Sequence, residues 1–311
     1  MKGSVVAICT SAKKGTGKQP VPSARLVRGV GLDDDAHGGS WHRQVSLLAE
    51  EQVDIMRQRG GLELPPGSFG ENILVRGFAL DALRVGQRFR VGDGVLLVTQ
   101  LGKECHSRCP IFEKVGDCIM PRAGVFARVA RGGTLQPGDT VATDPDLEVF
   151  RYAVLTASDR GAAGEREDAS GRLVAELIGR TMPGKEVARR LLSDEQASIE
   201  AELRRLADEE VCDLIVTTGG TGLSPRDVTP EATAAVIDRT VPGMAEAARA
   251  AGLRSTPNAM LSRAVCGLRG STLIVNLSGS PRAAREQLEI LLPVLPHAVA
   301  VARGIPQDCG R

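Results

Sequence analysis

One short segment, residues 217–222 (TTGGTG), limits what this chain can fold into more than any other stretch of it. It follows an apolar run at 212–216 that predicts a buried strand. It precedes a helix start, with Thr229 as N-cap, Pro230 at the first helical position and Glu231 in the first turn. A strand, a glycine loop and a helix in this order present backbone N–H groups to an anion, and the glycines keep Cβ atoms out of its way.

The loop by itself fits an ordinary turn as well as it fits a phosphate site. It matches neither GxGxxG nor the P-loop pattern, which needs a lysine after its last glycine. Asp227 follows the last glycine closely, so its carboxylate could hold a metal ion beside a bound phosphate. The rest of the chain has to decide between the two interpretations.

Length and composition set the broad class. The 311 residues favour two domains, and 42% hydrophobic with 25% charged residues is typical of a soluble globular protein. Basic and acidic residues nearly cancel, 39 against 38, and aromatics make up only 3%, so neither a nucleic acid nor an anionic membrane is an expected partner. No apolar run reaches the length of a membrane span. Seven mostly scattered cysteines predict reduced thiols and a cytoplasmic location.

The two halves follow different patterns, separated by a short acidic segment with a proline at 144–148. We expect a first domain at residues 1–146 and a second at 147–311. In the first, short strands alternate with Gly and Pro turns, and one helix is predicted at 49–59, with Val53 and Met56 on its inner face. This pattern predicts a mostly-β, barrel-like or sandwich-like domain. The expected strands are 3–10, 44–48, 72–75, 87–91, 95–100 and 139–143.

Two polar clusters in the first half, at 35–46 and 103–110, carry groups suited to chemistry. The basic neighbours of Cys105 would stabilise a thiolate, which could be a nucleophile, a sulfur carrier or a soft-metal ligand. A structural zinc is a second interpretation, although a second CxxC-type pair is missing; its ligands would come from Cys105, His106, Cys109, His37 and His42. A buried, inert thiol beside a solvated basic loop is the third.

These clusters belong to a set of segments that resembles the MOSC domain, named after the C-terminal part of molybdenum cofactor sulfurase. The segments are 35–39 (DAHGG), 43–48 (RQVSLL), 67–73 (GSFGENI) and 102–109 (GKECHSRC). The resemblance covers about residues 2–144. It implies a β-rich, barrel-like fold that binds molybdenum cofactor or carries sulfur through one cysteine. Cys105 matches that position, as sulfur carrier or molybdenum ligand, and His37, Arg43 and Asn72 are implied near the cofactor pocket.

In the second half, apolar strands alternate with amphipathic helices, which predicts a three-layer α/β domain with a mainly parallel sheet. Ligands of such sheets bind beyond the carboxyl ends of the strands, where polar segments follow four of the predicted strands here. Helix capping explains any one of them, Asp194 above all, but four on one rim favour a shared pocket. The expected strands are 152–156, 187–192, 213–217 and 272–277, and the expected helices are 169–178, 195–207, 231–238, 244–251 and 283–302.

These segments resemble the molybdopterin adenylyltransferase family, which includes the N-terminal domain of gephyrin. They are 156–160 (TASDR), 168–171 (DASG), 193–195 (SDE), 217–233, 241–244 (VPGM), 260–264 (MLSRA) and 276–281 (NLSGSP). The resemblance covers about residues 150–304. It implies a homotrimer or hexamer that converts molybdopterin and ATP to adenylyl-molybdopterin and pyrophosphate with Mg²⁺. Many relatives have proline where this chain has Ser278, a change that predicts a more flexible loop.

The resemblance also implies roles for particular residues. Asp227 is expected to hold Mg²⁺ on the triphosphate, and Asp194 to position the metal or the substrate. Ser158 and Asp159 are expected to bind substrate rather than to catalyse. Backbone groups are expected to hold phosphates at Gly219, Gly220, Thr221, Gly222, Gly279 and Ser280.

We therefore interpret the chain as a two-domain cytoplasmic enzyme of molybdenum cofactor biosynthesis. The second domain adenylylates molybdopterin, and the first binds the mature cofactor or transfers sulfur through Cys105. Molybdenum insertion proteins or acceptor molybdoenzymes are its expected partners. Two alternatives stay open: a cofactor carrier with an inactive transferase site, and a first domain that reduces N-hydroxylated compounds.

Overall fold

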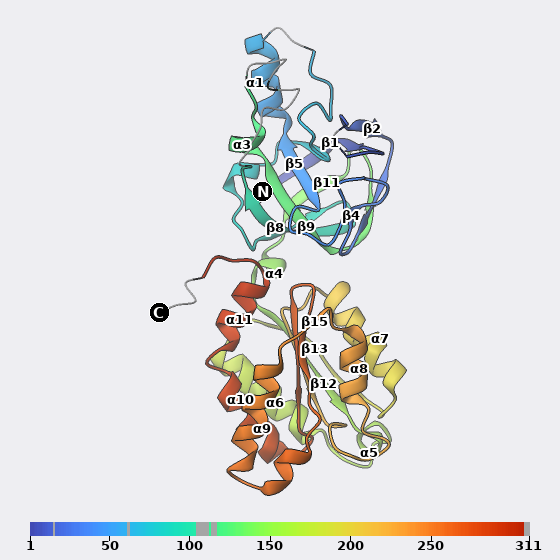
Figure 1. Cartoon of the computed structure of the whole chain (residues 1–311), viewed down its shortest axis with the longest axis vertical. Coiled ribbons are helices and arrows are strands. Elements are labelled where there is room, and N and C mark those ends of the chain that lie inside the picture. Colours follow the sequence, from blue (N-terminus) through green and yellow to red (C-terminus); the bar gives the residue numbers. More distant parts are fainter. Residues whose placement is uncertain (15, 61–62, 104–111, 113–116, 308–311) are drawn as a thin grey trace. The chain divides into compact units, whose positions relative to one another are not determined.

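A computed structural model describes residues 1–14, 16–60, 63–103, 112 and 117–307. The chain divides into two compact units. Residues Met1–Glu148 with Arg303–Pro306 form the first unit, and Val149–Ala302 form the core of the second (Figure 1).

The first unit is a β-barrel. In the described part of the chain, seven strands form a ring in the order β11-β7-β8-β9-β5-β6-β1, which closes through antiparallel pairing of β1 with β11. β2 adds to the edge of β1, and β10, β3 and β4 form a small second sheet. The strands are β1 (Lys2–Thr10), β2 (Gln19–Val21), β3 (Ala24–Val27), β4 (Gly31–Leu32), β5 (Val45–Ala49), β6 (Ile73–Arg76), β7 (Arg88–Val91), β8 (Gly94–Leu101), β9 (Val125–Arg131), β10 (Gly133–Leu135) and β11 (Thr140–Thr143).

Alternation of side chains along the strands separates two cores. Ile8 and Phe89 belong to the cluster that fills one side of the sheet, while Ala7 and Cys9 pack on the other with the helices. A register irregularity between Val5 and Ala7 brings Val5 to the side of Ile8. The helices of this unit are α1 (Glu50–Gly60), η1 (Leu80–Ala82), α3 (Met120–Ala123) and α4 (Pro145–Glu148). Val53 and Met56 of α1 are buried, as its period predicted. The barrel-like expectation is thus confirmed, although β9 and the short strands β2, β3, β4 and β10 were not predicted.

The second unit is an α/β domain around one sheet, with strand order β13-β12-β14-β17-β16-β15. Its strands are β12 (Arg151–Ala157), β13 (Lys185–Leu192), β14 (Leu214–Thr218), β15 (Arg239–Thr240), β16 (Cys266–Arg269) and β17 (Thr272–Leu277). Its helices are α5 (Asp159–Ala162), α6 (Ala169–Thr181), α7 (Gln196–Asp208), α8 (Thr229–Val236), α9 (Pro242–Leu253), η2 (Pro257–Leu261), α10 (Pro281–Leu291) and α11 (Leu295–Ala302).

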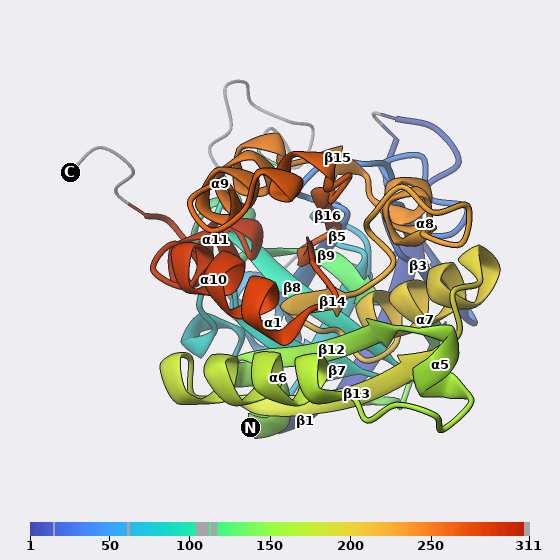
Figure 2. The ribbon, with the colours of Figure 1, turned by 90° about the horizontal axis from the view of Figure 1, so that it is seen from below.

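Helices cover both faces of this sheet (Figure 2). Val154 and Val216 face the cluster built with α6, α9, α10 and α11, whereas their neighbours Leu155 and Ile215 face α7 and α8. Because helices cover β14 on both faces, all five of its residues are buried, including its two threonines.

Two expectations for the second unit need correction. The sheet is mixed: β13, β12, β14 and β17 run parallel, but β16 pairs antiparallel with both β17 and β15. Neither β16 nor β15 was predicted. The single helix expected at 283–302 is two helices, α10 and α11. Pro293 lies between them, and its ring and missing N–H interrupt a helix at that point.

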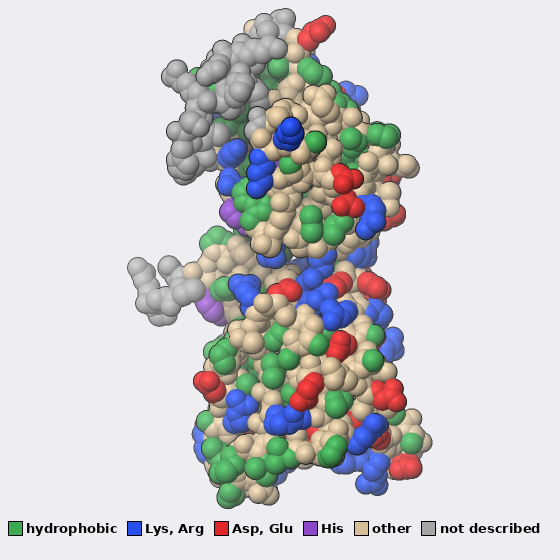
Figure 3. Space-filling model, turned by 45° about the vertical axis from the view of Figure 1, so that its right-hand side comes forward, with side chains coloured by type: hydrophobic (Ala, Val, Ile, Leu, Met, Phe, Trp, Pro, Cys, Tyr) green, Lys and Arg blue, Asp and Glu red, His purple; other side chains and the backbone are tan. Residues whose placement is uncertain are grey.

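The surface carries charges of both signs and scattered apolar side chains (Figure 3). Among the described residues, no helix combines the length and the apolar character needed to cross a bilayer. Hydrophobic side chains gather at the end of the second unit where α9 and η2 lie. Those that are most exposed in this region are Leu253, Met260 and Leu261.

Candidate functional site

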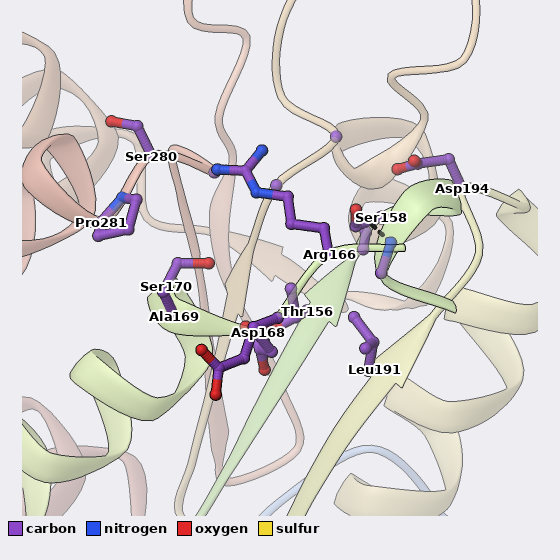
Figure 4. Close-up of a pocket in the computed structure, with 16 residues that line it drawn as sticks. Thr156, Ser158, Arg166, Asp168, Ala169, Ser170, Leu191, Asp194, Ser280 and Pro281 are labelled. Carbon is purple, nitrogen blue, oxygen red and sulfur yellow. Dashed lines mark hydrogen bonds between the residues drawn. The ribbon is translucent and has the colours of Figure 1, made fainter. Parts of the chain in front are cut away.

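A pocket of about 260 Å³ lies at the carboxyl ends of the parallel strands of the second unit (Figure 4). Polar ends of strands, the N-termini of α5, α6 and α10, and the glycine loop meet there. It is lined by Thr156, Ala157, Ser158, Gly161, Arg166, Glu167, Asp168, Ala169, Ser170, Leu191, Asp194, Gly219, Gly220, Gly279, Ser280 and Pro281. The predicted residues Ser158, Asp194, Gly219, Gly220, Gly279 and Ser280 therefore line one cavity.

The glycine loop needs glycine for geometric reasons. Gly219 and Gly220 have φ angles of +90° and +61°, a region that side chains with a Cβ disfavour. A Cβ on Gly219 would collide with the carbonyl oxygen of Ala157, and one on Gly279 would lie 3.0 Å from the Gly219 Cα. The Gly219 N–H donates to the Leu277 carbonyl at 3.3 Å, so this amide holds two strand ends together. The predicted phosphate cradle is thereby reduced by one donor.

Asp159 and Asp194 hold each other through their backbones. The Asp159 N–H donates to Asp194 Oδ2, and the Asp194 N–H donates to Asp159 Oδ1, both at 2.9 Å. Arg226 clamps the Asp159 carboxylate with two hydrogen bonds of 2.9 and 2.7 Å, which lowers the pKa of that carboxyl. Asp159 therefore lies outside the pocket lining and positions Asp194. Asp194 is not the N-cap of the helix that follows it, because the N-cap of α7 is Glu195; its carboxylate accepts instead from the first N–H of α5.

Burial raises the pKa of Asp194, and the nearby charges of Asp159 and Asp227 add to the rise. Asp194 Oδ1 is buried and has no hydrogen-bond partner among the described residues. The buried hydroxyl of Thr229 is unpartnered in the same sense. Both atoms face the position that a Cβ on Gly220 would occupy. Thr229 was predicted as the N-cap of α8, but it is the first residue of that helix, and the N-cap is Val228.

These oxygens fit a magnesium ion that shares its coordination with a substrate. Asp227 is half-buried, accepts a 2.8 Å hydrogen bond from the Ser224 N–H through Oδ2, and acts electrostatically on Asp194. No group of three or more His, Cys, Asp or Glu side chains in the described ranges could hold a metal. Mg²⁺ is commonly bound by one or two carboxylates together with substrate phosphates, and Asp194 and Asp227 match that demand.

Arg263 braces the loop that carries Asp227, a role that the sequence analysis missed. Its Nε donates to the Gly222 carbonyl at 2.7 Å, and its other nitrogens contact the Asp227 carbonyl and the Glu231 carboxylate. Its own N–H donates to the Thr221 carbonyl at 2.9 Å. Thr221 and Gly222 are therefore held by Arg263 and do not line the pocket. The partners of Arg263 are backbone carbonyls and one carboxylate that lie far from it in sequence, so no local pattern indicates this role.

The serines at the pocket cap helices. Ser158 accepts from the Gly161 N–H at the start of α5, and Ser280 accepts from the Ala283 N–H at the start of α10, both at 3.1 Å. Ser278 is also held, because its N–H and hydroxyl both bind the buried Gln287 amide, at 2.8 and 2.9 Å. Two hydrogen bonds to one side chain oppose the loosening that we expected from a missing proline.

In the first unit, the predicted residues surround a buried ion pair between Lys18 and Asp35. Asp35 also accepts from Asn72 Nδ2 at 2.8 Å and from the Ser11 N–H at 3.0 Å. Burial alone would raise the pKa of Asp35, but Lys18, Asn72 and Ser11 outweigh it and hold the pKa at about 2. Asn72 is only 2% exposed, and its amide hydrogen-bonds to the Ser46 N–H, the Cys9 carbonyl and Asp35, so it holds Asp35 from beneath.

His37 and Arg43 are the predicted residues that reach outward here. The Ser11 hydroxyl lies 3.0 Å from His37 Nδ1, which links the imidazole to Asp35. The Arg43 guanidinium stacks over the Trp41 ring at 4.8 Å. Cys105, together with His106 and Cys109, lies outside the described residues. Cys118 is buried in the cluster under α1 and α3.

Fold and pocket place the second unit among α/β proteins that bind ligands at the carboxyl ends of parallel strands. Residues 153–297 match the family described as "Probable molybdopterin binding domain", and residues 33–142 match the MOSC domain. The chain is 40% identical over 159 residues to a molybdopterin adenylyltransferase from Helicobacter pylori J99, covering 51% of this chain and 90% of that protein. It is 42% identical over 144 residues to that of Escherichia coli K12, covering 46% and 74%.

A solved structure from Thermus thermophilus, the molybdopterin biosynthesis enzyme MoaB, is 52% identical, with a TM-score of 0.48 and coverage of 51% of this chain and 99% of that one. From the curated relatives and the matched domains, the chain belongs to the molybdopterin adenylyltransferase family and carries a MOSC domain in its first half. Both resemblances seen in the sequence are confirmed, as is the prediction of an enzyme of the nucleotidyltransferase class.

Proposed function

We propose that the second unit adenylylates molybdopterin with Mg²⁺ and ATP and releases pyrophosphate. One observation carries the proposal: two buried, unpartnered oxygens, Asp194 Oδ1 and Thr229 Oγ1, face the glycine loop beside Asp227. Unsatisfied buried polar atoms destabilise a fold, so their presence in a strand-end pocket supports a ligand that completes them. An ATP-bound magnesium ion has the chemistry to do so.

The residues divide the work of binding and orientation. A phosphate oxygen of molybdopterin forms a bond to the α-phosphorus of ATP while the bond from that phosphorus to pyrophosphate breaks. Asp227 and Asp194 would hold Mg²⁺, whose chemistry when bound is to neutralise the triphosphate and the leaving group. Arg226 fixes Asp159, and Asp159 fixes Asp194, so the acid is oriented before substrates arrive. The glycine backbone leaves room for phosphate oxygens close to these acids.

For the first unit, we propose that it binds the mature molybdenum cofactor, or transfers sulfur, through Cys105. Two side chains support an anionic ligand of this unit: His37, which Ser11 and Asp35 orient, and Arg43, which stacks on Trp41. A Cys105→Ser variant should lose cofactor retention or a persulfide detected by mass spectrometry. If the variant keeps both, Cys105 has neither role.

We further propose a cytoplasmic homotrimer or hexamer that delivers cofactor to molybdenum insertion proteins or acceptor molybdoenzymes. ATP is a cytoplasmic substrate, and the free buried cysteines Cys9, Cys118, Cys212 and Cys266 suit a reducing compartment. The exposed Leu253, Met260 and Leu261 give the second unit an apolar surface suited to self-association. Light scattering across a concentration series would reveal the assembly.

The test incubates the full chain with ATP, Mg²⁺ and molybdopterin and separates the products by chromatography. Adenylyl-molybdopterin with stoichiometric pyrophosphate is the expected result. Tight molybdopterin binding without product would contradict the transferase and favour a carrier. Omission of Mg²⁺ is the matched control, because binding of molybdopterin alone should survive it while product formation should not.

A further inference from the structure

The arginines around the second unit's pocket are almost all paired with acids. Each of four has a carboxylate partner: Arg160 with Glu165, Arg172 with Glu167, Arg226 with Asp159 and Arg263 with Glu231. Arg166 is the exception, since no described residue forms a hydrogen bond or an ion pair with it. Its neighbours in sequence, Glu165 and Glu167, are both occupied by other arginines.

Arg166 is also the one base among the described residues that line the pocket. Three acids line it: Glu167, Asp168 and Asp194. Glu167 is paired with Arg172, and Asp168 caps α6 by accepting from the Gly171 N–H at 2.8 Å. Asp194 faces the glycine loop. A polyanionic substrate entering this pocket therefore meets one cation of the protein that has no competing partner.

The position of Arg166 suits contact with such a substrate. Figure 4 shows its side chain extending across the pocket from the loop before α6, with the guanidinium directed toward Ser280. Ser280 is the N-cap of α10, a helix of eleven residues whose N-terminus favours negative charge. Asp194 and Asp227 belong to the glycine-loop side of the site, where their carboxylates lie beside Gly220 and Gly222.

We propose that Arg166, with the N-terminus of α10, binds a phosphoryl group of a substrate in this pocket. The inference rests on the proposed function and names a binding residue that the family motifs leave unassigned. A guanidinium matches two phosphate oxygens with parallel hydrogen bonds, and an exposed loop arginine can turn toward them without breaking any pair. The group belongs either to the triphosphate of ATP or to the phosphate of molybdopterin.

The experiment compares Arg166→Gln with Arg180→Gln in the full chain. Arg180 lies near the end of α6 and pairs with Glu176, so its loss changes the net charge equally without touching the pocket. Calorimetry measures binding of inorganic tripolyphosphate, of Mg-ATP and of molybdopterin, and kinetics give KM and kcat for both substrates. Arg166→Gln should lower the affinity for the phosphate-bearing ligand that Arg166 contacts about tenfold and raise the KM of the corresponding substrate. Arg166→Lys should give intermediate values.

The pattern of losses identifies the source of the phosphoryl group. Weaker tripolyphosphate and Mg-ATP binding assigns Arg166 to the nucleotide, whereas weaker molybdopterin binding alone assigns it to the pterin phosphate. If the affinities of Arg166→Gln for all three ligands lie within twofold of those of Arg180→Gln, the proposal is overturned, even if wild type forms product. If wild type binds these ligands without forming product, the proposed function fails. The binding affinities of Arg166→Gln and Arg180→Gln then still test the role of Arg166.

Discussion

Replacing Asp35 by Asn removes the negative charge of the buried ion pair in the first unit while keeping the shape of the side chain. The Lys18 and Asp35 side chains are 4% and 0% exposed, so water cannot replace the lost partner. The amide nitrogen of the new side chain would also face a donor, either Lys18 or the Asn72 Nδ2 that now donates to Asp35. The variant therefore leaves a buried ammonium without its hydrogen-bonded counter-charge, with Glu71 as the remaining nearby acid.

The magnitude follows from this geometry. Removing one partner of a buried ion pair costs about 3–5 kcal/mol, because the other charge stays desolvated. The matched control is Asp33→Asn, since Asp33 and Arg25 lie 3.9 Å apart with side chains 49% and 71% exposed. Exposed pairs contribute about 0–1 kcal/mol. With a urea dependence of about 2 kcal/mol per molar, the two midpoints should differ by about 1–2.5 M.

The assay follows urea unfolding by the fluorescence of Trp41, the single tryptophan of the chain, which reports on the first unit. The pH dependence gives a second readout. The pKa of Asp35 is about 2 in the fold and about 3.8 when unfolded, so its stabilisation is complete above pH 4 and is lost as pH falls toward 2. Asp35→Asn should lack this component. Equal midpoints for Asp35→Asn and Asp33→Asn would refute the reasoning.

Three further predictions concern the second unit. Gly220→Ala should abolish product formation and cost about 1–2 kcal/mol, because φ is +61° and a Cβ meets Thr229; Gly243→Ala, with no atom within 4 Å, is its kinetic and thermal-melting control. Asp194→Asn should stabilise the unit at pH 7 by about 0.5–2 kcal/mol, because the raised pKa of Asp194 means that its ionisation removes stability as pH rises. The same variant should lose the stabilisation by Mg²⁺, and thermal melting with and without Mg²⁺ measures both effects. Arg263→Gln should speed hydrogen exchange in the glycine loop and lower kcat about tenfold or more; unchanged exchange would contradict the brace.

Much of the fold was predictable because its signals are local. Strand and helix periods in the second half, and the buried face of α1 in the first, follow from residues near in sequence. The antiparallel strands β15 and β16 were missed because they are two and four residues long and draw their pairing from partners elsewhere. The break at Pro293 was readable from proline chemistry and was overlooked.

The residues of the site likewise fall into those that local sequence predicts and those that it does not. Asp194, Ser158 and the glycines follow strands directly, so the rule for parallel sheets brings them to one rim. Arg263 and Arg226 act through carbonyl and carboxylate oxygens in other segments, which no local pattern encodes. Arg166 is conspicuous only once its neighbours Glu165 and Glu167 are seen to be engaged. Contacts between distant segments therefore supply what the motifs lack.

The most direct test of the central claim is the rate of adenylyl-molybdopterin formation by wild type and by Asp227→Ala with Mg²⁺ and ATP. Glu289→Gln, on the exposed surface of α10, serves as the control for loss of one negative charge. The account predicts product from wild type and from the control, and a rate at least about 100-fold lower for Asp227→Ala, with molybdopterin binding retained. Equal rates for Asp227→Ala and wild type, or no product from wild type, would contradict it.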